Sequence, residues 1–506
     1  MRRSLARAGT LRFPGSMRDS DATGNGTGES VVTIFAGRQL WLGLVVLLAL
    51  GCGDDGATDP GPGPGPDPDP DPVEPVYISG QVSGVGANVL SAEVTVAATG
   101  YDELVVHASR AGDESLATPA VSFDGETTTS VSVLGLHPES EYSLEITLSV
   151  DGVADVVDTL TYTTGSLPDW LPSIVPVGAA PAPGFLVLSP PGGPVIIDNT
   201  GRVVWYVTSP DPVLTSFQAH PDGSYTLLGR DTEVQEFRVL DELGSQVGGM
   251  ACVGWDETRF HEIRVEANGS YWVMCHDRRI ADLTDVGGLP EVALDWTVVQ
   301  HVSATGTLLW EWRSADHFDI TDVGAEAIAG ASAINVTHGN AIAFDTDGNL
   351  LVSFRELDEV TKIDAETGDV IWRFGGGLRN QFTFVNDPKG SFERQHGVRV
   401  VEPGVIQLLD NGDAVPSRLV RYRIDEQAKT AELLFEFIDS PDTYTPVGGG
   451  TDVLPDGGAL VSFGRAGRVV EVSASGERRW ELTGIDQLYV FRAERISSLY
   501  ALERRN

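Results

Sequence analysis

The sequence predicts an all-β fold on three observations, which are its composition, its hydrophobic alternation and an internal repeat. The chain has 506 residues, among them 58 Gly and only 34 Lys and Arg. Many Gly and β-branched residues, with few long helical patterns, favour short strands joined by tight turns. A chain of this length can hold more than one domain and a large buried core.

From about residue 180 two hairpin-like units alternate along the chain. The first has an acidic or similar turn, a Gly and often a Trp, as in VIIDNTGRVVWYV (195–207). The second has a DG or NG turn, a hairpin signal, as in IAFDTDGNLLVSFR (342–355). Two hairpins make a four-stranded blade, and the first unit recurs six times. We therefore expect a six-bladed β-propeller over residues 170–502, closed by its last hairpin against strand material at 185–188.

The N-terminus has the features of an export signal. Arg38 precedes an apolar run, Leu40–Leu50, that is too short to span a bilayer. Gly51 and Cys52 follow, as in a bacterial lipobox, although Ala49 stands where Leu is commonest. We expect residues 1–51 to be a signal peptide and Cys52 to be acylated, which would anchor an exported protein in the cell envelope through lipid. The alternative is a plain secretory signal followed by a free Cys.

Two further segments precede the repeats. Cys52 begins a segment, residues 52–75, that is rich in Pro and Asp, and such a segment stays extended as a linker. Residues 76–166 contain alternating apolar stretches typical of short strands. Within them, a Leu, a Pro and then Tyr142 resemble the fibronectin type III pattern, in which the Tyr forms a tyrosine corner. We expect a small fibronectin III-like β-sandwich at 76–166.

Charge and cysteine content restrict the partners. The formal net charge of −39 repels nucleic acid, and it repels anionic substrates at long range. An anion-binding site must therefore concentrate its few cations locally. Cys252 and Cys275 lie 23 residues apart in a chain expected to be exported, so they could form a disulfide or remain two buried thiols. No cysteine has the spacing of a zinc site.

Three histidines lie at a similar short offset before a hairpin turn, namely His261, His338 and His396. Equivalent positions in a propeller face one axis, so we expect the three imidazoles to converge. His220 lies directly in a turn, AHPDG, and is expected to be exposed. Arg355 ends the apolar strand LLVSFR, and its planar fork suits tetrahedral oxyanions. A salt bridge to Glu356 or Asp358 is the simpler explanation for this arginine.

From the residues alone, such a centre suits a sulfate or phosphate ester, or a metal held by three histidines. Several motifs resemble those of the arylsulfate sulfotransferases, a family of six-bladed propellers that use no nucleotide sulfate donor. The motifs are FHEI (260–263), HGN (338–340), LLVSFR (350–355), KIDAETGDVIWRFGG (362–376), RQH (394–396), LLDNG (408–412) and FRAERISSLY (491–500).

The resemblance implies that His396 is the nucleophile and forms a sulfohistidine. Arg355, His338 and His261 would stabilise the sulfuryl oxygens and assist proton transfer. Asn340 and Thr451 would contact the substrate. The implied partners are an aryl sulfate donor and a phenolic acceptor, without metal or other cofactor, and a homodimer is one assembly to consider. Two alternatives stay open: a non-catalytic surface propeller for ligand binding or adhesion, and a metal-dependent hydrolase or lyase that uses the three histidines.

Overall fold

The computed structural model describes residues 74–501 apart from 113–114, 180, 191, 209–213, 230–234 and 485–488. Strands dominate these residues, with one short helix, α1 (Ala325–Ile328), and the 3-10 turns η1 (Thr284–Val286), η2 (Ser314–Asp316), η3 (Ile320–Val323), η4 (Arg355–Leu357) and η5 (Gly464–Ala466). The predicted all-β class is confirmed. No helix in this part of the chain is long and apolar enough to cross a membrane. The predicted signal peptide and Cys52 lie outside the described residues.

The strands between Val76 and Thr163 form two sheets. One has the order β1 (Val76–Gly84), β2 (Ala92–Thr99), β6 (Thr128–Val133). The other has the order β4 (Leu116–Ala117), β3 (Glu103–Ser109), β7 (Glu141–Val150), β8 (Val153–Thr163), with β5 (Val121–Ser122) paired to β3. Every second residue of β2 is fully buried, as the period of a strand with one core face requires. The Tyr142 hydroxyl accepts a hydrogen bond from the His137 backbone N–H at 2.9 Å.

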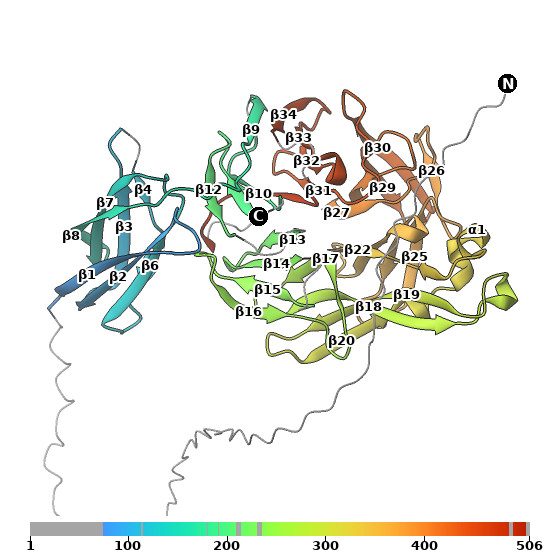
Figure 1. The fold of residues 1–506 in the computed structure, drawn as a ribbon, viewed down its shortest axis with the longest axis horizontal. Helices are drawn as coiled ribbons and strands as arrows, with labels where there is room; N and C mark the ends of the chain where they lie inside the picture. The colour runs from blue at the N-terminus through green and yellow to red at the C-terminus, as the bar shows by residue number, and fades with distance from the viewer. Residues whose placement is uncertain are drawn as a thin grey trace, which may run out of the picture. The chain divides into compact units, whose positions relative to one another are not determined.

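Six sheets of four or five strands follow in the described part of residues 175–496 (Figure 1). In strand order they are β12 (Val203–Tyr206), β11 (Val195–Ile197), β10 (Phe185–Leu188), β35 (Ala493–Ile496); β13 (Leu214–Ala219), β14 (Tyr225–Gly229), β15 (Phe237–Leu240), β16 (Gln246–Met250); β17 (Thr258–Val265), β18 (Tyr271–Ala281), β19 (Val292–Val302), β20 (Leu308–Arg313), with β21 (Ala333–Asn335) beside β19; β22 (Gly339–Phe344), β23 (Leu350–Phe354), β24 (Glu359–Ile363), β25 (Val370–Gly375); β26 (Thr383–Val385), β30 (Thr430–Ile438), β29 (Arg418–Asp425), β28 (Val405–Asp410), β27 (His396–Glu402); and β31 (Gly450–Val453), β32 (Ala459–Ser462), β33 (Val469–Val472), β34 (Arg478–Thr483), β9 (Val175–Gly178).

Neighbouring sheets meet through the strands at their inner edges. β13 lies against β17, β17 against β22, β22 against β27, β27 against β31, and β31 against β35. β10 completes the ring, because it pairs with β35 and lies against β13. We expected the last hairpin to pair with residues 185–188, and this detail is wrong: β34 pairs with β9, and residues 185–188 pair with the C-terminal β35. The first strand of this region, β9, thus joins the last sheet, and the last strand, β35, joins the first sheet.

A hydrophobic core fills the space between each pair of neighbouring sheets. One core, for example, joins Trp272 and Val299 of the third sheet to Ile342 and Val352 of the fourth. Because inner strands such as β23 and β28 are covered on both faces, all their residues are buried, and most of these residues are apolar. The ring holds β17, β22 and β27 side by side, and these three strands carry or adjoin the three predicted histidines.

Candidate active site

A cavity of about 610 Å³ lies where the third to sixth sheets meet. Its lining residues are Phe260, His261, His338, Arg355, His396, Val447, Gly448, Arg465, Tyr489 and Phe491. The structure thus brings the three histidines and the arginine singled out from the sequence into one cavity wall. The Nε2 atoms of His261 and His338 are 3.1 Å apart, and the rings of His261 and His396 have centroids 6.5 Å apart.

The hydrogen bonds of His396 fix its tautomer. Nδ1 lies 2.8 Å from Asn411 Oδ1 and 3.0 Å from the Arg394 carbonyl oxygen. The Asn411 amide nitrogen donates to the carbonyls of Thr445 and Gly448, so its oxygen must face the imidazole. With two acceptors around it, Nδ1 carries the proton. The lone pair of the neutral imidazole is therefore on Nε2.

Burial keeps this imidazole uncharged. His396 is 2% exposed, and burial together with the nearby Arg355 guanidinium lowers its pKa to about 4. The hydrogen bonds to Asn411 and Arg394 oppose this shift only in part. At neutral pH the ring is a neutral base with one available nitrogen, which is the form that a nucleophile needs.

His261 and His338 form a coupled pair. The Asn335 amide nitrogen donates to Nδ1 of His338 at 2.8 Å, which leaves the proton on Nε2 of His338 to be donated to Nε2 of His261. Nδ1 of His261 is then protonated, and it has no partner among the described residues. Burial lowers the pKa of both imidazoles well below the usual value, and neighbouring positive groups lower it further. The cavity wall therefore presents uncharged imidazole N–H groups as hydrogen-bond donors.

The backbone at His338 is strained, with φ at 50° in the left-handed region. Such a conformation costs a non-glycine residue about 1–3 kcal/mol and persists only where its surroundings hold it. Here the Gly339 N–H donates to Thr297 Oγ1 at 2.9 Å, and the Arg355 N–H donates to the His338 carbonyl at 3.1 Å. The second bond ties the backbones of two cavity residues together.

Arg355 has one N–H donor that makes no hydrogen bond to the described residues. Its Nη1 pairs with Glu356, as one sequence interpretation expected, and its Nη2 donates to the Pro446 carbonyl at 3.2 Å. Its Nε–H is buried and has no partner among the described residues. A buried guanidinium N–H without an acceptor is costly, so this N–H is available to an acceptor that reaches it. The salt bridge to Glu356 does not use it.

Asn340 and Thr451 are not among the residues that line the cavity, and their contact with substrate stays a prediction. The Asn340 side chain donates to the Gln395 carbonyl at 2.7 Å, and the Thr451 hydroxyl donates to the Gly397 carbonyl at 3.0 Å. These carbonyls belong to the residues on either side of His396. Both side chains are almost fully buried and brace the backbone that carries His396.

An aromatic wall that sequence reasoning missed stands beside the histidines. Phe260 stacks on His261 with ring centroids 4.1 Å apart, and Phe491 meets the same imidazole edge-on at 5.7 Å. Tyr489 lies next to Phe491, with centroids 6.2 Å apart. Phe260 and Phe491 fell within motifs noted for their resemblance, but no spacing rule marks them or Tyr489 as cavity residues. Together they offer an aromatic surface of mutually inclined rings to a ligand.

A buried carboxylate lies next to His261 in β17. Burial alone would raise the pKa of Glu262, but ion pairs with Arg264, Arg399 and Arg492 outweigh it and lower the pKa to about 2. The cluster joins β17, β27 and the C-terminal segment. Its arginines lie outside the cavity lining. Sequence reasoning missed this cluster, because its members lie in three separate segments of the chain, at residues 262–264, 399 and 492.

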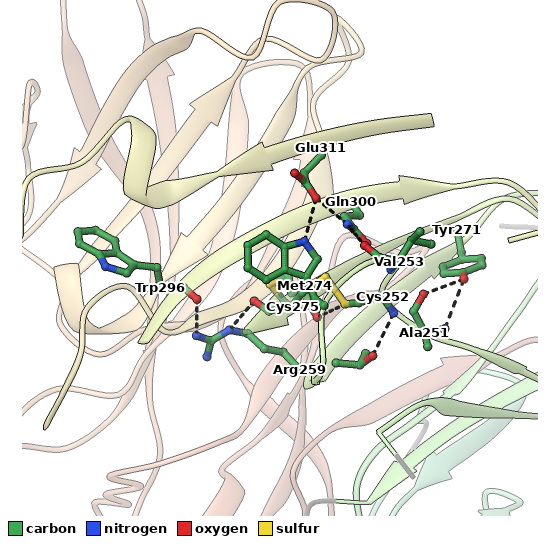
Figure 2. Close-up of a disulfide and its surroundings, with 12 residues drawn as sticks. Ala251, Cys252, Val253, Arg259, Tyr271, Met274, Cys275, Trp296, Gln300 and Glu311 are labelled. Carbon is green, nitrogen blue, oxygen red and sulfur yellow. Dashed lines mark hydrogen bonds between the residues drawn. A yellow bond between two sulfur atoms is a disulfide. The ribbon is translucent and has the colours of Figure 1, made fainter. Parts of the chain in front are cut away.

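A disulfide joins Cys252 to Cys275 of β18 (Figure 2). The Cys275 carbonyl accepts from Nε of Arg259 at 3.3 Å, and Nη2 of the same guanidinium donates to the Trp296 carbonyl at 3.1 Å. Arg259 is 1% exposed and directly precedes Phe260 and His261. Of the two states left open by the sequence, the bonded one is found. It fixes the segment that leads into the active-site strand.

The structure also bears on His220 and on the metal site that the three histidines could form. His220 was expected to be exposed, but it is 5% exposed, and its Nε2 lies 2.8 Å from Thr226 Oγ1, because its turn folds back onto β14. Among the described residues, no group of three or more His, Cys, Asp or Glu side chains is arranged to hold a metal ion. The cavity is instead lined by two arginines, three neutral imidazoles and aromatic rings.

The site is thus a cavity in an all-β ring, lined by three histidines and two arginines. Residues 253–485 match the model of the arylsulfotransferase (ASST) family. The matched segment contains all four predicted catalytic residues, His261, His338, Arg355 and His396. This match supports aryl sulfotransferase activity in general. No curated protein matches the chain.

Several solved structures are similar in part. A protein of unknown function from Bacteroides caccae has 14% identity and a TM-score of 0.42, over 63% of this chain and all of that one. A catalytically inactive virginiamycin B lyase from Staphylococcus aureus, solved with quinupristin, has 9% identity and a TM-score of 0.34, over 60% of this chain and 87% of that one. At these TM-scores neither similarity bears on the function of this chain.

Proposed function

We propose that this protein transfers a sulfuryl group from a phenolic sulfate ester to a phenolic acceptor through a covalent intermediate on His396. The observation that carries the proposal is the neutral His396 imidazole in the cavity wall, with Nδ1 bound by two acceptors and Nε2 without a hydrogen bond to the described residues. A neutral imidazole nitrogen with a free lone pair is a nucleophile.

In the first half-reaction Nε2 of His396 attacks the sulfur of the aryl sulfate in line with the ester oxygen. A nitrogen–sulfur bond forms as the sulfur–oxygen bond to the aryl group breaks, and the aryl oxygen leaves with the electron pair. The imidazole keeps its proton on Nδ1, so the positive charge of the sulfohistidine lies next to Asn411 Oδ1 and the Arg394 carbonyl. Both oxygens stabilise that charge.

Charge on the three sulfuryl oxygens requires donors that are already in place. The unsatisfied Nε–H of Arg355 and the unsatisfied Nδ1–H of His261 are two such donors. Nε2–H of His338 becomes a third if its bond to His261 opens. Preorganised donors in a buried site are worth far more than in water, and removing one costs about 10²–10³-fold in rate.

The His261–His338 pair can also move the proton that the reaction needs. One imidazole of the pair would take up a second proton as the anionic sulfate ester binds, give that proton to the leaving phenolate, and take it back from the acceptor phenol, so the pair is restored after each cycle. In the second half-reaction the acceptor oxygen attacks sulfur, and the nitrogen–sulfur bond breaks. The Phe260, Tyr489 and Phe491 wall would hold the aryl ring in both halves, which favours a ping-pong reaction at one site.

The same proposal extends to architecture and location. The ring contacts and shared cores of the six sheets support a six-bladed propeller over 170–502. The Tyr142 hydrogen bond supports a fibronectin III-like sandwich at 76–166. Residues 1–51 would be removed on export, Cys52 would carry the lipid anchor and residues 52–75 would act as the tether in the cell envelope. A homodimer would be compatible with these roles.

The test is the release of 4-nitrophenolate from 4-nitrophenyl sulfate, with and without phenol. For the wild type we expect release that depends on phenol, with phenyl sulfate detected by mass spectrometry. His396→Ala should abolish it. His317→Ala is the matched control, because His317 is exposed, stacks on Trp312 and lies outside the cavity. It should retain wild-type rates.

Three results would overturn the proposal. Equal release without phenol would indicate a sulfatase. No turnover of any aryl sulfate would favour a ligand-binding or adhesion protein. Loss of activity on treatment with a chelator, restored by a divalent metal, would favour a metal-dependent hydrolase or lyase.

A further inference from the structure

Arg465 differs from most arginines of this acidic protein, because no carboxylate pairs with it among the described residues. It lines the cavity from η5 and is exposed. Its neighbour Arg468, by contrast, pairs with Asp439 and Glu481, and the other cavity arginine, Arg355, pairs with Glu356. In a chain of net charge −39, an unpaired guanidinium at a cavity is a local exception to the repulsion of anions.

The backbone of Arg465 is held rigidly against the cavity wall. Its N–H lies 3.3 Å from the Val447 carbonyl and 3.1 Å from Thr445 Oγ1. The preceding residue is Gly464, where a Cβ atom would lie 2.4 Å from the Val447 carbonyl oxygen. Only glycine allows this close approach, so η5 packs directly on the loop that supplies Val447 and Gly448 to the cavity.

The same turn is bonded to the aromatic wall. The Val490 N–H donates to the Gly464 carbonyl at 3.1 Å, and the Gly449 N–H donates to the Phe491 carbonyl at 2.9 Å. Val490 lies between Tyr489 and Phe491, the two wall residues from the C-terminal segment. Arg465, the loop at 447–449 and the wall are therefore one hydrogen-bonded unit, and the side chain of Arg465 starts from a fixed place beside the surface proposed to hold the aryl ring.

We propose that Arg465 is a specificity-determining residue that binds a second anionic group, a carboxylate or sulfate, on the aromatic ring of the sulfate donor. This inference rests on the proposed function. Arg355 and the histidines serve the sulfuryl group that is transferred, which leaves Arg465 for a different oxyanion. A guanidinium suits this role, because its planar fork matches either oxyanion in a bidentate manner.

The experiment compares kcat/KM for 4-carboxyphenyl sulfate and its neutral methyl ester, with phenol as acceptor. In Arg465→Gln we expect the ratio of the two values to fall by about twofold to fivefold, as for an exposed ion pair. Arg465→Lys should retain part of the ratio, and Arg465→Glu should reverse it. Added salt should reduce the wild-type preference. A parallel pair with a second sulfate in place of the carboxylate distinguishes the two anions.

Arg423→Gln is the matched control, because it removes one exposed arginine that pairs with Glu432 and lies outside the cavity. It should leave the ratio unchanged. An unchanged ratio in Arg465→Gln would overturn the inference, and so would an equal loss for both esters, which would assign Arg465 to the transferred group. Failure of the wild type to turn over either ester would instead contradict the proposed function itself.

Discussion

Asn411 Oδ1 lies 2.8 Å from Nδ1 of His396, and the Asn411 amide nitrogen is bound by two backbone carbonyls that prevent the side chain from turning over. A residue 15 positions along the chain thus selects which imidazole nitrogen carries the proton. The motif LLDNG that contains Asn411 was noted in the sequence, but no role was assigned to the asparagine. Its effect on His396 makes it a positioning residue.

Asn411→Ala should lower kcat/KM for aryl sulfates by about tenfold, because one of the two acceptors that hold Nδ1–H is lost, while the Arg394 carbonyl remains. The loss should fall mainly on kcat, since Asn411 does not line the cavity. Steady-state kinetics at several pH values checks this. The acid limb should move to lower pH, because the bond to Asn411 raises the pKa of His396.

The matched control is Asn380→Ala. Asn380 also bonds backbone, donating to the Phe382 carbonyl at 2.8 Å, but it lies away from the cavity. It should lower the melting temperature without changing the pH profile of kcat/KM. A profile that moves equally in both variants would show that Asn411 acts only through stability.

Acid should destabilise the fold in part through His396. In the folded chain its pKa is lowered to about 4 by burial and Arg355, whereas the unfolded value is about 6.5. Below pH 6.5 the unfolded state therefore binds a proton that the folded state does not. The free energy of unfolding should fall as pH drops from 6.5 to about 4, by about 1.4 kcal/mol per pH unit from this group.

Urea denaturation at pH 7 and pH 5 checks this expectation. His396→Gln removes the titrating group, so its loss of stability between the two pH values should be smaller than that of the wild type by about 2 kcal/mol. Carboxylates contribute to acid denaturation in both proteins, and their contribution cancels in the comparison. Equal losses in the two proteins would contradict the lowered pKa of His396.

Reduction of the Cys252–Cys275 disulfide should lower the free energy of unfolding by about 3 kcal/mol, the chain-entropy value for a loop of this length. A thermal melt with and without a reducing agent measures the effect. Cys252→Ser/Cys275→Ser should melt at the lower temperature in both conditions. A reducing agent that shifts the double variant as much as the wild type would act elsewhere.

Local sequence patterns predicted the strands well, because each hairpin carries its own signal. Alternation marked β2 and β7, and DG or NG turns marked the β17–β18 and β22–β23 hairpins. The pairing of β10 with β35 was not predicted, since residues about 300 positions apart leave no local pattern that specifies a register. Closure of the ring depends on which strand edges remain free after the other sheets have formed.

The sequence also identified four chemical groups of the cavity, because the three histidines share a similar offset before a hairpin turn and Arg355 ends an apolar strand. It assigned Asn340 and Thr451 to the substrate, and it did not predict that both side chains also bond the backbone on either side of His396. Polar type alone does not reveal this second contact. The direction of a side chain depends on strand register, and register depends on neighbours in space.

By itself the sequence determined the all-β class, the repeated hairpins and which three histidines and which arginine are candidate catalytic residues. These predictions follow from residue type and from short-range periodicity. Only the tertiary structure decided that His396 is neutral with its lone pair on Nε2. It also decided that, among the described residues, Arg355 Nε–H has no acceptor and Arg465, beside the aromatic wall, has no carboxylate partner. Protonation, hydrogen-bond satisfaction and ion pairing depend on which groups lie within a few ångströms, and most of those groups are distant along the chain.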